Sequence, residues 1–95
     1  AFERYVASGE INTTVPDPRA VIDVVASRMG SGQWAAAVTD TLDGLTVDMG
    51  DWWFNLRPSN TEPLLRLNLE ASSAELLEEK TAQVQALIDD ISAAR

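Results

Sequence analysis

The sequence contains no cysteine and no histidine among its 95 residues. Without cysteine the chain forms neither a disulfide nor a thiolate metal site, and it has no thiol nucleophile. Without histidine a Ser-His-Asp triad is excluded, and an ordinary zinc site nearly so. Any chemistry that this chain performs alone must therefore use carboxylates, hydroxyls, arginine or lysine.

Long apolar runs are also missing. No stretch approaches the roughly 20 apolar residues that a membrane span needs, and no signal peptide is visible. The length predicts one domain over residues 1–95, and hydrophobic residues make up 45% of the chain, which is enough for a hydrophobic core. The first residue is Ala1 rather than methionine, which indicates a piece of a longer protein.

Basic residues are scarce. Seven Lys and Arg stand against fifteen Asp and Glu, so the formal net charge is −8. A field of that sign repels nucleic acids and anionic membranes, because both are bound largely through neutralisation of their phosphates. The sequence therefore predicts neither a nucleic-acid nor a membrane partner. If the chain binds an anion, it does so in a small local pocket that contains arginine.

The apolar patterns predict two helices and several strands. Asp17 and Pro18 form a helix start, and the apolar stripe that follows ends at Gly30. The sequence Ser72-Ser73-Ala74-Glu75 fits a capping box that opens a second, longer helix. Residues 30–33 are expected to form a mobile connector. Strands are expected at residues 4–11, 38–42, 45–49, 52–57 and 64–71, with a two-residue turn at Asp43 and Gly44.

Alternation along the strands divides the sheet into an apolar face and a polar face. Trp52 and Phe54 share the parity of apolar neighbours and are expected in the core, whereas Trp53, Arg57 and Arg66 point the other way. We predict an α+β two-layer sandwich, an antiparallel sheet of four to five strands with two helices on one face. On the open polar face, Trp53 either meets a neighbouring domain or cleft, or is a partly exposed sheet residue.

The seven residues from Arg57 to Pro63 connect two predicted strands. Arg57, Ser59, Asn60 and Thr61 supply a guanidinium, two hydroxyls and a carboxamide within five positions. These groups suit a phosphate, which accepts paired hydrogen bonds from arginine and single bonds from hydroxyls and turn amides. A turn whose polar side chains merely satisfy their own backbone is the alternative that the residue types leave open.

Two neighbouring charged residues also have alternative roles. Arg66 either helps to hold the anion or pairs with a carboxylate across the sheet. Glu62 either orients Arg57 or is a solvated turn residue.

Asp40 and Asp43 resemble a pair of catalytic carboxylates, but a hairpin turn at Gly44 accounts for Asp43.

The loop Arg-Pro-Ser-Asn-Thr-Glu-Pro, followed by Leu-Leu-Arg-Leu-Asn-Leu-Glu-Ala, closely resembles the C-terminal domain signature of the α-D-phosphohexomutases. The resemblance extends to Tyr5 through Ser8-Gly9-Glu10-Ile11-Asn12 and to Leu42-Asp43-Gly44, so that it covers essentially the whole chain. Asn60 favours the phosphomannomutase/phosphoglucomutase branch, because phosphoglucosamine mutases typically carry glycine there.

The resemblance implies the last of four domains in a cytoplasmic enzyme that interconverts hexose 1- and 6-phosphates through a bisphosphate intermediate. Its partners would be mannose or glucose phosphates and the preceding domains of the same chain. The matching residues Arg57, Ser59, Asn60 and Thr61 would hold the phosphate that is not being transferred. The family's phosphoserine and Mg²⁺-binding aspartates belong to earlier domains, so no catalytic residue, metal ligand or cofactor is expected here. A free-standing small-molecule-sensing or protein-interaction module is the alternative.

Overall fold

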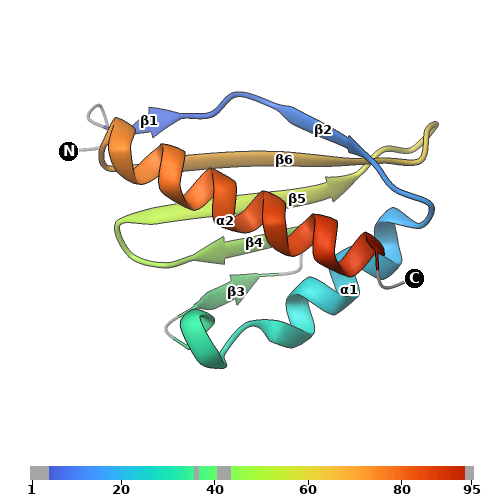
Figure 1. The fold of residues 1–95 in the computed structure, drawn as a ribbon, viewed down its shortest axis with the longest axis horizontal. Helices are drawn as coiled ribbons and strands as arrows, with labels where there is room; N and C mark the ends of the chain where they lie inside the picture. Colours follow the sequence, from blue (N-terminus) through green and yellow to red (C-terminus); the bar gives the residue numbers. More distant parts are fainter. Residues whose placement is uncertain (1–4, 36, 41–43, 94–95) are drawn as a thin grey trace.

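The computed structural model describes residues 5–35, 37–40 and 44–93. The chain forms two layers, with both helices lying across one face of the sheet (Figure 1), which confirms the predicted α+β sandwich. The strands are β1 (Val6–Ala7), β2 (Ile11–Thr14), β3 (Val38–Asp40), β4 (Leu45–Asp48), β5 (Trp52–Pro58) and β6 (Leu64–Ala71). The helices are α1 (Pro18–Arg28) and α2 (Ala74–Ala93), with a short 3₁₀ turn η2 (Gly32–Trp34).

Across the described residues the sheet is antiparallel and has six strands rather than the predicted four to five. Its order is β1–β6–β5–β4–β3, and β2 pairs with β6 beside β1. The extra strand arises because the segment predicted as one strand over residues 4–11 forms β1 and the start of β2 instead, with residue 4 outside the described part. Strand β6 therefore lies between β5 and the two N-terminal strands, and the loop that joins β5 to β6 emerges at one end of the sheet.

A bulge separates β1 from β2. Ser8–Glu10 stand opposite only two residues of β6, because Ala7 pairs with Glu70 and Ile11 pairs with Leu67. Gly9 takes a positive φ of 74° within it. Continuing the β1 register would set Glu10 opposite Leu67 on the apolar side, but the extra residue sets Ile11 there instead. The bulge thereby moves Glu10 to the polar face.

The core lies between the sheet and the helices and confirms the predicted parity. Trp52 and Phe54 are buried, with 4% and 0% of their surface exposed. Trp34 joins them, its ring centroid 5.9 Å from that of Trp52 and 6.2 Å from that of Phe54. Within the predicted connector at residues 30–33, the second half belongs to the 3₁₀ turn η2, which continues to the core residue Trp34. The Gly30 N–H donates to the Trp34 carbonyl at 2.8 Å and closes the turn.

The hairpin between β3 and β4 has a different register from the predicted one. A two-residue turn at Asp43 and Gly44 would set Asp40 opposite Val47, but Asp40 pairs with Thr46. The predicted turn residue Asp43 and the end of the predicted strand over 38–42 lie outside the described residues. Gly44 has a φ of 85°, and a Cβ on it would lie 2.5 Å from the Leu56 carbonyl oxygen. Only glycine suits this close approach to β5.

The helix starts agree with the sequence at α1 and differ by one residue at α2. The Asp17 carboxylate accepts from the Ala20 N–H at 3.2 Å, with Pro18 as the first helical residue, as predicted. At α2 the hydroxyl of Ser73, not Ser72, accepts from the Leu76 N–H at 3.1 Å. Glu75 therefore stands one position too early for the reciprocal bond of a capping box.

Replacing Ser73 with alanine is expected to lower the free energy of unfolding by about 1 kcal/mol, because the N-cap bond is lost. Ser72→Ala is the matched control, since Ser72 contributes only its backbone N–H, which donates to the Asp51 carbonyl. Urea unfolding of both variants measures the difference. Equal effects at the two positions would show that Ser73 is not the cap.

Candidate functional site

The site lies on the face of the sheet that neither described helix covers (Figure 1). Strand pairing sets its polar side chains in rows that cross the sheet. Thr46, Asn55 and Asn68 form the middle row, and the Asn55 amide donates to the Thr46 hydroxyl at 3.0 Å. The row at the far end contains Trp53 and Glu70. Trp53 is half-buried there and is away from the loop.

At the loop end, Arg57 of β5 and Arg66 of β6 stand directly opposite each other. Side chains in directly opposed positions have Cβ atoms about 4.5–5.5 Å apart, and like charges so placed destabilise a sheet. The strand pairing therefore concentrates positive charge at one point of a chain whose net charge is −8. Two neighbouring guanidinium groups are a suitable partner for an oxyanion.

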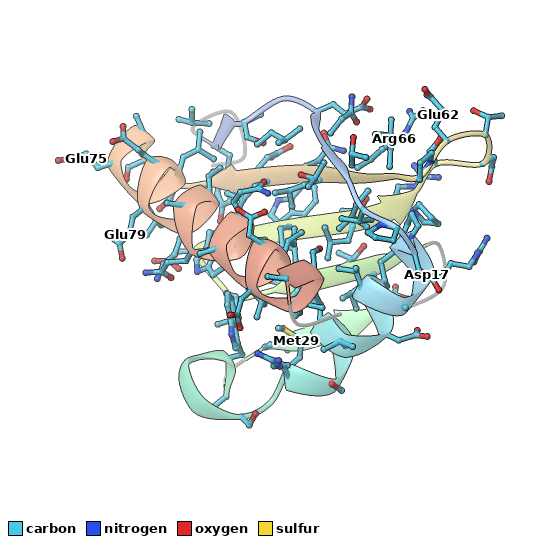
Figure 2. All side chains as sticks on the ribbon, turned by 45° about the vertical axis from the view of Figure 1, so that its right-hand side comes forward. Asp17, Met29, Glu62, Arg66, Glu75 and Glu79 are labelled. Carbon is cyan, nitrogen blue, oxygen red and sulfur yellow. The ribbon has the colours of Figure 1, made fainter. Side chains whose placement is uncertain are left out.

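An open hollow of about 390 Å³ lies beside this pair. All four predicted phosphate-binding residues, Arg57, Ser59, Asn60 and Thr61, line it. Its volume is within the range of about 300–1,000 Å³ typical of small-molecule sites. The remaining lining residues are Glu10, Pro58, Arg66 and Asn68. Figure 2 shows Arg66 and Glu62 at this same end of the molecule, where β5 turns into β6.

The backbone holds the loop at its base and leaves amides available at its tip. The Ser59 N–H donates to the Leu64 carbonyl at 3.0 Å, and the Val15 N–H, just after β2, donates to the Pro63 carbonyl at 2.9 Å. Within the described chain, the N–H groups of Asn60 and Glu62 donate to no protein acceptor. Exposed turn amides of this kind can donate to a bound anion.

The side chains of the loop are only slightly engaged with their own backbone. The Ser59 hydroxyl accepts from the Thr61 N–H at a long 3.4 Å, and it can still donate its own hydrogen. Asn60 and Thr61 form no side-chain hydrogen bond in the described part of the chain. The alternative of a self-satisfied turn thus accounts for one weak bond, and most of the polar groups at the loop tip remain available to a ligand.

The two charged neighbours of the loop take different positions. The Arg66 Nη1 lies 3.6 Å from the Glu10 Oε1, so Arg66 pairs with a carboxylate, which is one of its two predicted roles, and Arg66 also lines the hollow. Glu62 is exposed and forms no ion pair with Arg57 among the described contacts. The solvated alternative for Glu62 therefore agrees with the structure.

Sequence reasoning missed two lining residues, Glu10 and Asn68. The parity of Asn68 in its strand placed it on the polar face of the sheet, but nothing in the local pattern indicated that it lies near the loop. Glu10 is far away in sequence, and only the bulge at Ser8–Glu10 brings it to Arg66. Trp53 does not line the hollow, so the structure gives no support to a role of Trp53 at the mouth of this hollow. The predicted contact of Trp53 with a neighbouring domain remains a prediction.

Two further properties concern the described residues as a whole. Nowhere in residues 5–35, 37–40 and 44–93 do three or more acidic residues gather in an arrangement that could hold a metal ion. Within the same ranges, neither helix combines the length and the apolar character that crossing a membrane requires.

The fold and the hollow define a two-layer α+β domain with an arginine-lined polar site at one end of an open sheet face. Residues 10–90 match the family described as phosphoglucomutase/phosphomannomutase, C-terminal domain. The chain therefore belongs to this family, as its sequence resemblance indicated.

Similar proteins agree with the family match. The chain is 39% identical over 92 residues to a phosphomannomutase of Methanocaldococcus jannaschii, which covers 97% of this chain and 19% of that protein. It is 42% identical over 88 residues to a protein of Xanthomonas campestris named phosphohexose mutases, and the match covers 92% of this chain and 19% of that protein. A phosphomannomutase of Salmonella typhimurium is 41% identical over 86 residues, and the match covers 90% of this chain and 18% of that protein. The chain thus spans about a fifth of the length of these curated relatives.

Proposed function

We propose that residues 1–95 form the C-terminal domain of a phosphomannomutase/phosphoglucomutase and hold the substrate phosphate that is not being transferred. One observation carries the proposal: Arg57, Ser59, Asn60 and Thr61 line a single hollow at the tip of the β5–β6 loop. The family membership and the names of the similar proteins support the class of enzyme.

The chemistry of the hollow matches a phosphate dianion. Arg57 can give two parallel charge-assisted hydrogen bonds to two phosphate oxygens. The hydroxyls of Ser59 and Thr61 and the turn amides supply further donors from one side. Because the loop is joined to two paired strands and its base is closed by backbone hydrogen bonds, little ordering entropy is lost when the anion binds.

A phosphate held away from the reaction serves as a handle. Its binding energy positions the sugar so that the other end meets the phosphoryl donor, which lowers the entropic part of the barrier. In a reaction that passes through a bisphosphate, either phosphate must be accepted by the same hollow. The loop should therefore recognise a phosphoryl group without regard to the sugar, and sugar selection would lie largely in other domains.

The rest of the enzyme follows from the same proposal. The substrates would be mannose or glucose 1- and 6-phosphate and their bisphosphate. The catalytic serine and the Mg²⁺ would be supplied by preceding domains of the same chain. The family match favours this assignment over a free-standing sensing or interaction module. The cytoplasmic location and the absence of nucleic-acid and membrane partners remain predictions.

Replacing Arg57 with alanine in the complete protein is expected to weaken binding of glucose 1-phosphate about 10- to 150-fold, because a charge-assisted bidentate contact is lost. Titration calorimetry measures this dissociation constant directly. Arg57→Lys should recover only part of the affinity, since a lysine keeps the charge but not the planar fork.

Arg19→Ala is the matched control, because it removes an exposed arginine from α1, in the helix layer rather than on the open sheet face. This variant should bind glucose 1-phosphate as the unmodified protein does. If Arg57→Ala and Arg19→Ala gave the same affinity, the hollow would not be the phosphate site.

A further inference from the structure

The hollow contains three charged side chains, and one of them has the wrong sign for an anion site. Arg57 and Arg66 contribute positive charge, whereas Glu10 contributes a carboxylate to the same wall. The Arg66 Nη1 lies 3.6 Å from the Glu10 Oε1, with 43% and 46% of the two side chains exposed. A pair at this distance and exposure is weak, because water and salt screen the two charges. It can therefore be broken by a stronger ligand of Arg66.

Arg66 also carries a donor that Glu10 does not satisfy. Its Nε is buried and has no hydrogen-bond partner among the described residues. Leaving a buried charged donor without an acceptor is costly. The guanidinium is thus incompletely paired, although a carboxylate stands beside it.

The position of Glu10 depends on a specific backbone feature. Without the bulge at Ser8–Glu10, the β1 register would turn Glu10 towards the apolar side of the sheet, opposite Leu67. Gly9, with its φ of 74°, occurs within this bulge. Bulges commonly re-aim a side chain next to a functional site. Here the re-aimed side chain is the carboxylate that contacts Arg66.

We propose that Glu10 is an internal competitor for Arg66. In the unliganded domain Glu10 pairs with Arg66, and a phosphoryl group that enters the hollow takes over the guanidinium while Glu10 turns into solvent. Arg66 is then a second guanidinium of the phosphate site, opposite Arg57. This inference rests on the proposed function, because it assigns two more residues to the same hollow.

The exchange has a clear consequence for affinity. Each time the phosphate binds, the Glu10–Arg66 pair must break, and the negative carboxylate remains nearby. Both effects weaken the hold on the phosphate. An enzyme that binds a non-reacting phosphate too tightly gains no rate from it, since only interactions stronger in the transition state accelerate the chemical step. Glu10 would keep the hold loose enough for the bisphosphate to leave and return in the other orientation.

The test is a double-mutant cycle in the complete protein, with inorganic phosphate as the probe and calorimetry at constant pH and ionic strength as the measurement. Glu10→Gln should tighten phosphate binding about two- to fivefold, because the competing ion pair is removed. Arg66→Gln should weaken it about tenfold, because a charge-assisted contact is lost. In the Arg66→Gln background, the effect of Glu10→Gln should become smaller, since the competition for Arg66 is gone and only the repulsion between the carboxylate and the phosphate remains.

Glu70→Gln is the matched control, with the same loss of charge on the same sheet face but at the opposite end of β6, beside Trp53. It should change phosphate affinity little, because charges far apart on the surface are screened by salt. Equal effects of Glu10→Gln and Glu70→Gln would overturn the exchange, as would weaker binding in Glu10→Gln or an unchanged effect in the Arg66→Gln background. If Arg57→Ala also left phosphate affinity unchanged, the proposed function itself would fail, so the two failures are distinguishable.

Discussion

Phe54→Ala is expected to lower the free energy of unfolding by about 3–5 kcal/mol, because the substitution removes a buried ring and leaves a cavity. Phe54 is 0% exposed and is stacked on Trp52, with ring centroids 5.8 Å apart. The edge of the Trp34 ring closes the same cluster. Small domains have a total stability of about 5–15 kcal/mol, so that this one substitution removes a large part of it.

Urea unfolding followed by tryptophan fluorescence measures the loss. Val38→Ala is the control on the same sheet, since Val38 is 69% exposed and its truncation should cost less than about 0.5 kcal/mol. Similar losses at the two positions would show that the aromatic cluster is not the centre of the core.

Gly44→Ala is expected to destabilise the fold by about 2–5 kcal/mol, combining an unfavourable positive φ with a steric clash. A Cβ at this position would lie 2.5 Å from the Leu56 carbonyl oxygen and 3.0 Å from the Arg57 Cγ. The strand that carries Arg57 must therefore shift to accept it. We expect phosphate affinity to fall as well, because Arg57 would leave its place beside the loop.

Gly30→Ala separates the cost of the positive φ from the cost of the steric clash. Gly30 has nearly the same φ, 87° against 85°, but nothing lies within 4 Å of its added Cβ. This variant should lose only the backbone contribution, about 1–3 kcal/mol, and bind phosphate normally. If the two alanine variants were equally stable and bound phosphate equally well, the close approach of Gly44 to β5 would not position Arg57.

Most of the secondary structure was predictable because its signals are local. Alternation in residues 52–57 and 64–71 identified the buried face of β5 and β6, since the side-chain period of a strand leaves no other face for those residues. Asp17 and Pro18 identified the start of α1, because capping involves only neighbouring residues. The loop after Arg57 was recognisable for the same reason: its donors stand next to one another in the sequence.

The predictions failed where a residue distant in the sequence decides the local structure. Trp34 follows a glycine-containing segment that resembles a linker, and only its packing against Trp52 and Phe54 makes it a core residue. The strand predicted over residues 4–11 is interrupted because β6 accepts β1 and β2 in registers that differ by one residue. At the start of α2 the Ser72 N–H donates to the Asp51 carbonyl, a partner distant in sequence, and Ser73 is the cap.

The sequence by itself determined the two layers, the buried parity of each main strand and the cluster of hydrogen-bond donors from Arg57 to Thr61, because periodicity and turn chemistry act over a few residues. Only the tertiary structure decided that Arg66 stands opposite Arg57 and that Glu10 reaches Arg66. Strand register is set by packing the whole apolar face against the helices, and a single extra residue in a bulge reverses the direction of a side chain. The charge balance of the hollow is therefore a property of the assembled sheet.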